Sequence, residues 1–273
     1  MSAYRDEAEA LLAARLGDAL NKSRRGEIAM LSYLTPREQK RAARILSACG
    51  EQGSAWCWGG YPDSERACLF VLPDYLTAIL EAMTDASPND VTELLGEDVT
   101  DAVCAVEIRG SGYRVLTHRD YLGSILALGI ERDSFGDIAL QDEHRAVVFC
   151  TAKMASFLCE NLERVASDAV KCRPCVLDDT FTDGRRYAAV NDTVASARLD
   201  CVVAALTNLS REAAQHAVKS GLVEVDFEAE ERTDFQLTAP ATISIRGYGR
   251  FILRSFDGET RKGRLRMRAD RLV

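Results

Sequence analysis

Apolar residues recur along the chain with two different periods, and these periods predict both helices and strands. Apolar residues three and four positions apart predict helices over 4–18, 36–49 and 118–128. Alternating or continuous apolar runs predict strands over 67–72, 101–108, 113–116, 138–140, 145–150 and 169–177. Thr35 and Thr117 stand where N-caps are expected, and Pro36 suits a first helical position. Helices and strands are mixed throughout, so the sequence predicts an α+β fold.

The segment 197–251 predicts two short helices followed by strands. The first helix has an apolar stripe made of Leu199, Val202, Val203 and Leu206. Asn208 and Ser210 are both good N-cap residues, and either can start a second helix at Arg211. Gly221 has the position of a helix C-cap, after which 222–225 continues as a strand. We therefore expect two helices that pack at an angle.

A polar and partly basic row lies on the predicted second helix. Arg211, Gln215 and Lys219 are four residues apart, so they share one face. Side chains that donate hydrogen bonds over different lengths suit phosphate oxygens and the edges of RNA bases. A solvated helix face is the alternative, and the spacing alone does not decide between the two.

Four short motifs follow one another in this segment: Arg198-Leu-Asp200, Leu209-Ser-Arg211, Lys219-Ser-Gly-Leu-Val223 and a closing strand that ends at Phe251. Together they resemble the alpha-L (S-four type) RNA-binding module, which is named after a small-subunit ribosomal protein. The ending Arg246-Gly-Tyr-Gly-Arg250-Phe251 is similar to that of the YlmH family of bacterial RNA-binding proteins. The resemblance implies RNA contacts from Arg198, Arg211, Gln215, His216, Lys219, Ser220, Arg246, Gly247, Gly249 and Arg250.

Two stretches upstream also resemble the YlmH family. One is the loop Gly59-Gly-Tyr-Pro-x-x-Glu-Arg66 before an apolar strand; the other runs from Leu116-Thr-His-Arg-Asp-Tyr-Leu-Gly123 to Phe135-Gly-Asp-Ile138. The resemblance covers roughly 34–253. It implies a small N-terminal α/β domain (1–80), a central α/β RNA-binding-like domain (81–178) and the alpha-L module (191–273). Polar and turn residues over 178–193 predict a linker.

The two glycines of that loop, Gly59 and Gly60, stand beside two tryptophans. Glycine allows a tight turn, and aromatic neighbours favour burial. We therefore predict a packed corner of a small domain here, in preference to a ligand-binding loop.

Charge is distributed unevenly along the chain. The net charge is −8, which alone speaks against nucleic acid, but 246–273 contains nine Lys or Arg and three Asp or Glu. That end therefore carries +6 and the remainder −14. The alternation over 261–268 predicts an edge strand with one basic face. The acidic stretch 225–231 would repel phosphate, so we do not expect it to contact RNA.

His118-Arg119-Asp120 invites comparison with a kinase catalytic loop, but no glycine-rich phosphate loop, strand lysine or Asp-Phe-Gly accompanies it. A helix N-terminus bearing His118 and Arg119 can accept an RNA phosphate. Alternatively, Thr117 and Asp120 cap the helix while Arg119 pairs with a local carboxylate. Both interpretations remain open.

Metal and cofactor chemistry have little support in the sequence. The three histidines lie far apart, and Cys172-Arg-Pro-Cys175 lacks the second pair that a zinc site needs. No serine-hydrolase set, Walker loop or dinucleotide motif is present. We expect no catalytic residue, no metal and no cofactor.

Composition favours a soluble protein. Hydrophobic residues make up 47% and charged residues 28%, no long apolar run exists, and the N-terminus lacks a signal-peptide pattern. Nine scattered cysteines indicate reduced, mostly buried thiols, as in cytoplasmic proteins. We expect a monomer without a membrane partner.

The resemblance implies a non-enzymatic protein that docks on rRNA and tRNA of the large ribosomal subunit. It would act in bacterial ribosome quality control, on obstructed subunits that carry peptidyl-tRNA. Two alternatives remain. One is an RNA-modifying enzyme or its accessory that uses the module for targeting, and the other is a scaffold linked to ribosome assembly or cell division.

Overall fold

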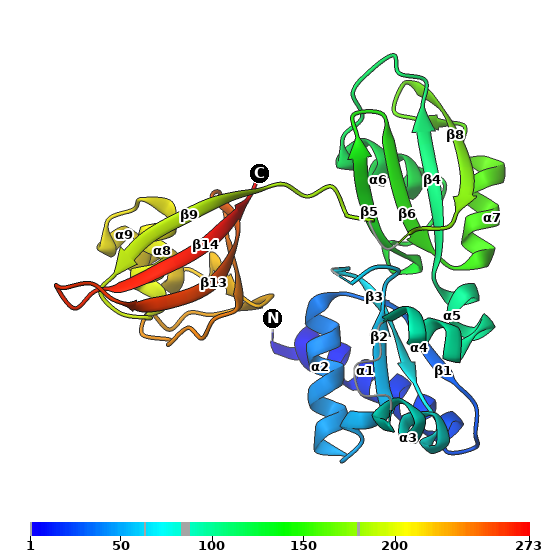
Figure 1. Ribbon diagram of the computed structural model, residues 1–273, viewed down its shortest axis with the longest axis horizontal. Helices are drawn as coiled ribbons and strands as arrows, with labels where there is room; N and C mark the ends of the chain where they lie inside the picture. The colour runs from blue at the N-terminus through cyan, green and yellow to red at the C-terminus, as the bar shows by residue number, and fades with distance from the viewer. Residues whose placement is uncertain (1, 63, 83–87, 179–180) are drawn as a thin grey trace. The chain divides into compact units, whose positions relative to one another are not determined.

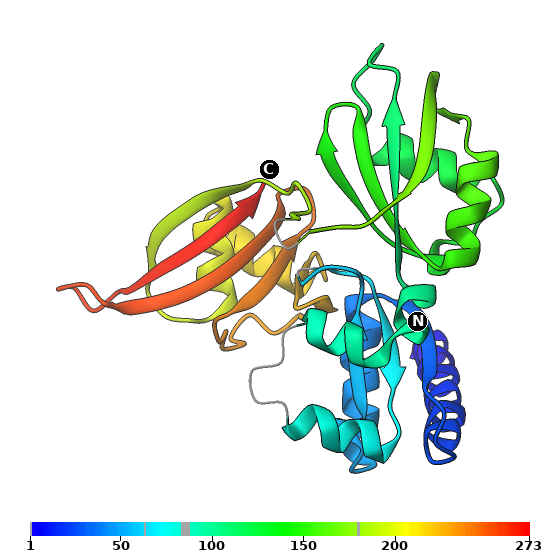
Figure 2. The ribbon, with the colours of Figure 1, turned by 45° about the vertical axis from the view of Figure 1, so that its right-hand side comes forward.

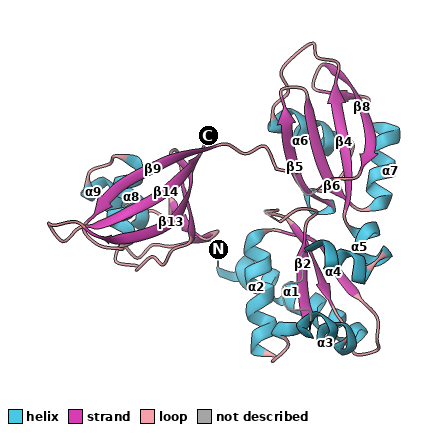
Figure 3. Ribbon diagram, viewed as in Figure 1, coloured by secondary structure: helices cyan, strands magenta, loops and turns pink. Residues whose placement is uncertain are grey.

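The chain folds as two units, residues Met1–Gly184 and Arg185–Val273, in the computed structural model of Figure 1. The structure describes residues 2–62, 64–82, 88–178 and 181–273. Over these residues, helices alternate with strands that form three sheets (Figure 3). The mixed α+β class predicted from the sequence is therefore confirmed. Each unit is described separately below.

The first unit begins with a three-stranded antiparallel sheet in the order β1-β3-β2. Its elements are α1 (Ser2–Ser23), β1 (Ala29–Leu34), α2 (Pro36–Ala48), η1 (Gln52–Ser54), β2 (Ala55–Trp58) and β3 (Ala67–Val71). Leu16 and Leu46 bring α1 and α2 into one core with Leu31 and Val71 of the sheet. Thr35 caps α2 with the reciprocal Glu38 bond of a capping box, as its sequence predicts.

Three short helices then lead to a second sheet: α3 (Asp74–Ala82), α4 (Pro88–Leu95) and α5 (Glu97–Ala102). That sheet is five-stranded and antiparallel, in the order β5-β6-β4-β8-β7. Its elements are β4 (Cys104–Gly110), α6 (His118–Ala127), η2 (Arg132–Ser134), β5 (Phe135–Asp142), β6 (Arg145–Cys150), α7 (Ala152–Asn161), β7 (Arg164–Val165) and β8 (Asp168–Cys175). Helices α6 and α7 cover the same face of the sheet (Figures 1 and 2), where Tyr121 and Leu158 pack against Val106 and Ile108.

Two strand predictions in this region need correction. The strand expected over 101–108 begins later, because Asp101 and Ala102 complete α5. The strand expected over 113–116 is a loop. Residues 113–116 alternate in exposure, as a strand would. They cannot pair with the preceding strand β4, however, because β6 and β8 already occupy both of its edges.

The glycine loop after β2 joins the two sheets of this unit. The Asp137 carboxylate on β5 accepts hydrogen bonds from Tyr61 Oη (2.7 Å), the backbone N–H of Glu65 (2.7 Å) and that of Arg66 (3.1 Å). Gly60 has φ +104°, and a Cβ there would lie 2.2 Å from the Phe149 ring. The loop is therefore a packed corner, as predicted, apart from Asp63, which lies outside the described residues.

The second unit contains one six-stranded antiparallel sheet in the order β11-β10-β12-β13-β14-β9. Its elements are β9 (Tyr187–Val194), α8 (Leu199–Thr207), α9 (Arg211–Lys219), β10 (Val223–Val225), β11 (Glu228–Ala229), β12 (Ala241–Ile245), β13 (Gly249–Glu259) and β14 (Leu265–Leu272). The apolar stripes of α8 and α9 share a core with this sheet, in which Val202 and Val218 meet Ile243 and Phe251. The helix pair expected from 197–221 is therefore present (Figure 1).

The linker predicted over 178–193 is shorter than expected. Residues 187–193 belong to β9, which pairs along its whole length with β14, and the boundary between the units falls after Gly184. Asp179 and Thr180 lie outside the described residues. Residues 178–193 suggested a linker because polar residues dominate there. The strand β9 forms nevertheless, because β14, which is distant in the sequence, pairs with it.

Two further details of this unit differ from expectation. The basic strand β14 was expected at an edge, but β9 pairs with its outer side, so β14 is internal. The closing strand expected over 243–251 is a hairpin, because the chain reverses through Gly247 (φ +87°) between β12 and β13.

Candidate nucleic-acid interface

A buried carboxylate organises the predicted RNA-binding residues of α8 and α9. Arg198 directly precedes α8 and turns back on Asp200, with Nε 3.0 Å from Oδ1 and Nη2 3.1 Å from Oδ2. Gln215 on α9 donates from Nε2 to Oδ2 over 2.8 Å, and Arg211 Nε lies 3.6 Å from the same oxygen. Three of the residues predicted from the sequence are thus brought together by a fourth that was not predicted as a site residue.

Asp200 is fully buried, and this determines how the cluster behaves electrostatically. Burial alone would raise the pKa of its carboxyl, but the hydrogen bonds from Arg198 and Gln215 outweigh burial and hold the pKa well below its usual range. Asp200 is therefore an anion that fixes the direction of Arg198 and Gln215. The signal in the sequence was its place two residues after Arg198.

The outer surface of α9 carries the rest of the predicted row. Ser210, and not Asn208, is the N-cap, since its Oγ accepts from the backbone N–H of Ala213. Lys219 is exposed, and the Arg211 side chain is 61% exposed. His216 and Ser220 are also exposed and lie 3.5 Å apart, Nδ1 to Oγ. Two cations therefore reach solvent along one helix face.

The β12–β13 hairpin lies beside the end of α9. Arg246 donates its backbone N–H to the Leu222 carbonyl at 2.9 Å, which ties the hairpin to the turn at Gly221. A shallow hollow of about 500 Å³ here is lined by Gly221, Leu222, Glu224, Ser244, Ile245, Arg246, Gly247, Gly249 and Arg250. The structure thus places all four predicted hairpin residues around one depression.

The acidic turn beside this hairpin contributes an aromatic ring to it. The Arg250 guanidinium lies over the Phe227 ring, 5.4 Å from the centroid. Phe227 comes from the stretch 225–231, which we did not expect to contact RNA. Its ring orients one of the predicted arginines.

His118 and Arg119 begin α6 in the first unit, whereas the other predicted RNA-contacting residues belong to the second. Thr117 and Asp120 form a capping box at the start of α6, and hydrogen bonds from Thr117 hold the pKa of Asp120 below its usual value. Arg114 forms an ion pair with Asp120 at 3.6 Å, whereas the expected pairing of Arg119 with a local carboxylate is not seen among the described residues. The capping interpretation is confirmed, and a phosphate contact from His118 or Arg119 stays a prediction.

The Cys172/Cys175 pair lies on β8 with its members on opposite faces. Cys172 packs toward the core under α6 and α7, where burial raises its pKa to about 12, and Cys175 packs toward the other core of the unit. Across the described part of the chain, no three His, Cys, Asp or Glu side chains are grouped to hold a metal. None of the helices described there is both long and apolar enough to cross a membrane.

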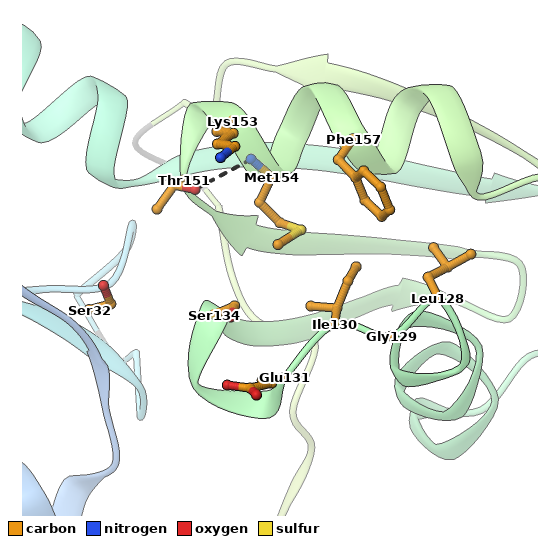
Figure 4. Close-up of a pocket in the computed structure, with 10 residues that line it drawn as sticks. All are labelled: Ser32, Leu128, Gly129, Ile130, Glu131, Ser134, Thr151, Lys153, Met154 and Phe157. Atoms are coloured by element: carbon orange, nitrogen blue, oxygen red, sulfur yellow. Dashed lines mark hydrogen bonds between the residues drawn. The ribbon is translucent and has the colours of Figure 1, made fainter.

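Figure 4 shows a hollow of about 520 Å³ in the first unit that the sequence did not predict. It is lined by Ser32, Leu128, Gly129, Ile130, Glu131, Ser134, Thr151, Lys153, Met154 and Phe157. The one hydrogen bond drawn between these side chains and backbone is the N-cap bond from the Met154 N–H to Thr151 Oγ1.

These features define a mixed α+β protein whose best-organised polar surface is of the nucleic-acid-binding type. Residues 102–179 match the family model described as "Putative RNA-binding domain in YlmH". The chain is 30% identical over 246 residues to "Ribosome-associated protein quality control protein P2" of Bacillus subtilis (strain 168), which covers 89% of this chain and 86% of that protein. The chain therefore belongs to the YlmH family, as its motifs indicated.

The "Cell division protein ylmH from Streptococcus pneumoniae" aligns with 62% of this chain and 88% of its own, with a TM-score of 0.42 and 19% identity.

Proposed function

We propose that this protein binds RNA through its second unit and docks on the large ribosomal subunit, where it contacts rRNA and tRNA. The observation that carries the proposal is the buried Asp200 carboxylate, which holds Arg198 and Gln215 at the surface and attracts Arg211. A preorganised set of donors loses little side-chain entropy when it binds a phosphate. The helix pair is also what the alpha-L resemblance of the sequence implies.

The docked protein acts in bacterial ribosome quality control, on obstructed large subunits that carry peptidyl-tRNA. The name of the Bacillus subtilis relative, "Ribosome-associated protein quality control protein P2", supports this process. The family model for an RNA-binding domain supports RNA as the partner. Within the described residues, no residue cluster favours either alternative, an RNA-modifying enzyme or its accessory, or a scaffold linked to ribosome assembly or cell division.

In this proposal the second unit binds the RNA backbone through positively charged side chains. Arg211 and Lys219 provide charge along α9, while Arg246 and Arg250 provide it from the hairpin. Gly247 and Gly249 carry no side chain, which allows RNA to approach the hairpin backbone closely. The protein performs no chemical step; it acts as a cytoplasmic monomer that holds an RNA complex in place.

Sedimentation of the tagged protein through a sucrose gradient of bacterial lysate tests the proposal. The wild type should migrate with large subunits, and an Arg211→Ala/Lys219→Ala variant should stay near the top because two phosphate contacts are lost. The matched control is Arg15→Ala/Lys22→Ala, which removes the same charge from exposed positions on α1. If the wild type itself stays at the top, the ribosome proposal is wrong.

A further inference from the structure

On the face of the five-stranded sheet that points away from α6 and α7, Ala139, Val147 and Phe149 are buried in a core with Tyr61 and Phe181. The rest of this face carries basic residues. On β4, Val106 and Ile108 point toward the helices, so Glu107 and Arg109 lie on the opposite face. The same alternation places Arg145 of β6 and Lys171 and Arg173 of β8 on that face, because Ala146, Val170 and Cys172 pack toward the helices. We refer to Arg109, Arg145, Lys171 and Arg173 as the open-face cluster.

Strand register brings three of these cations into one row. Arg109 is paired directly with Arg145 on one side and with Lys171 on the other. Like charges on directly opposite residues destabilise a sheet. Three cations across three adjacent strands, which span about 10 Å, are therefore unfavourable for folding and are typical of a surface that binds a polyanion.

One buried carboxylate contacts the three arginines of the cluster. Glu107 is 7% exposed and lies in the next row of the sheet, opposite Arg173. Its Oε1 accepts from Arg173 Nε at 2.9 Å and lies 3.6 Å from Arg109 Nε, and its Oε2 lies 3.5 Å from Arg145 Nη1. Each guanidinium has five N–H donors, whereas Glu107 offers two oxygens, so most of these donors are left for another partner.

The cluster remains positive and accessible. Asp142 pairs with Arg145 at 3.2 Å, so four cations face two acids. The Arg173 side chain is 69% exposed and that of Arg109 57% exposed. The arrangement repeats the one around Asp200, with a buried acid that orients arginines whose remaining donors reach solvent.

An exposed aromatic residue follows Arg109 by four positions in the chain. Tyr113, which is 88% exposed, follows β4 in a loop that starts at Ser111. The loop is anchored because Ser111 donates both its backbone N–H and its hydroxyl to the buried Asp168 carboxylate. An exposed aromatic side chain beside a basic groove or row is the arrangement that binds unpaired bases by stacking.

We propose that the open-face cluster binds single-stranded RNA through its sugar-phosphate backbone, as a second RNA site in addition to α9 and the hairpin. The chemistry of the cluster selects a phosphate polyanion with bases free to stack on Tyr113. The location agrees with the family model, which spans 102–179 and so includes all four cations. The site lies wholly in the first unit, so it can be tested separately from the RNA contacts proposed for the second unit.

Fluorescence anisotropy of a labelled single-stranded oligouridylate, titrated with the full chain, tests this site. We expect Lys171→Glu to weaken binding about fivefold or more at low salt, since a phosphate contact becomes a repulsion. Arg109→Gln/Arg173→Gln should lower the slope of log affinity against log salt by about 1.4. Because Glu107 loses partners in the double variant, the single Lys171 change keeps the test valid if the double variant is unstable.

The matched control is Lys153→Glu, which makes the same charge change on α7, on the other side of the same sheet. A thiouridine in the oligonucleotide, followed by photocrosslinking and peptide mapping, should give adducts near 107–113 or 169–173. The site is wrong if Lys171→Glu binds like Lys153→Glu or if adducts fall elsewhere. In either case an acidic protein segment becomes the better candidate partner. The same titration in Arg211→Ala/Lys219→Ala separates the two sites: binding that persists there and is then lost with Lys171→Glu belongs to the open-face cluster.

Discussion

Gln215 of α9 donates its side-chain amide to the Asp200 carboxylate of α8 over 2.8 Å. The bond links two helices that otherwise meet through apolar residues and the ion pair of Arg211 with Asp200, and it occurs at a carboxylate that is fully buried. Apolar stripes allow helices to slide by small amounts, whereas a buried hydrogen bond requires one arrangement. The same carboxylate therefore orients Arg198 and also fixes how α9 is placed on α8.

We predict that Asp200→Asn destabilises the second unit by about 2 kcal/mol or more, because Arg198 and Gln215 lose a charged acceptor in a buried site. The measurement is hydrogen exchange with mass spectrometry over 199–219. Both tryptophans lie in the first unit, so the denaturant transition followed by tryptophan fluorescence should not change. Equal protection in variant and wild type would contradict the prediction.

Acid should weaken the second unit through the same residue. The folded-state pKa of Asp200 is depressed, so its contribution is fully present above the unfolded pKa of about 4 and is lost as pH falls below that value. We expect exchange over 199–219 to speed up between about pH 5 and pH 3, after correction for the intrinsic rate. Asp200→Asn, which does not ionise, should show a smaller change with pH.

Lys219 and Gln215 should affect RNA binding in different ways. Lys219→Ala removes an exposed charge, so the slope of log affinity against log salt should fall by about 0.7 to 0.9. Gln215→Ala removes a neutral group bonded to Asp200, so affinity should decrease while the slope is unchanged. Salt titrations of both variants against the same RNA test this. Identical slope changes would show that α9 does not bind phosphate as proposed.

We expect Gly60→Ala to destabilise the first unit by more than about 2 kcal/mol, because the new Cβ meets Phe149 at 2.2 Å in a left-handed backbone. Gly112→Ala is the matched control: its φ is also positive (+89°), but nothing lies within 4 Å. It should cost only about 1 kcal/mol. Denaturant titration followed by tryptophan fluorescence measures both, since Trp58 directly precedes Gly59-Gly60. Equal stability losses would show that the corner is not tightly packed.

The helix starts could be predicted because a cap is determined within four residues. Thr35 and Thr117 form capping boxes where the sequence placed them. Even so, the choice between Asn208 and Ser210 was not decided by residue type. Asn208 adopts a left-handed conformation (φ +56°) that ends α8, and this leaves Ser210 to begin α9.

Features that depend on distant partners could not be predicted. The polar stretch 187–193 becomes a strand only because β14 pairs with it, and 113–116 stays a loop because β4 has no free edge. The motifs identified Arg198, Arg211 and Gln215, but not the common partner that holds them. That Asp200 is buried follows from the packing of α8 against the sheet, which residue spacing along one helix does not reveal.

The pairing of β9 with β14 has a consequence for how the chain is made. The first strand of the second unit in chain order, β9, is also the outer strand of its sheet, and its partner β14 comes after β13 in the chain. A nascent chain that has exposed β9, α8 and α9 therefore has both helices but an unpaired edge until β14 emerges. Interrupted translation would leave that edge open, so only chains synthesised through β14 can complete the sheet that supports the Asp200 cluster.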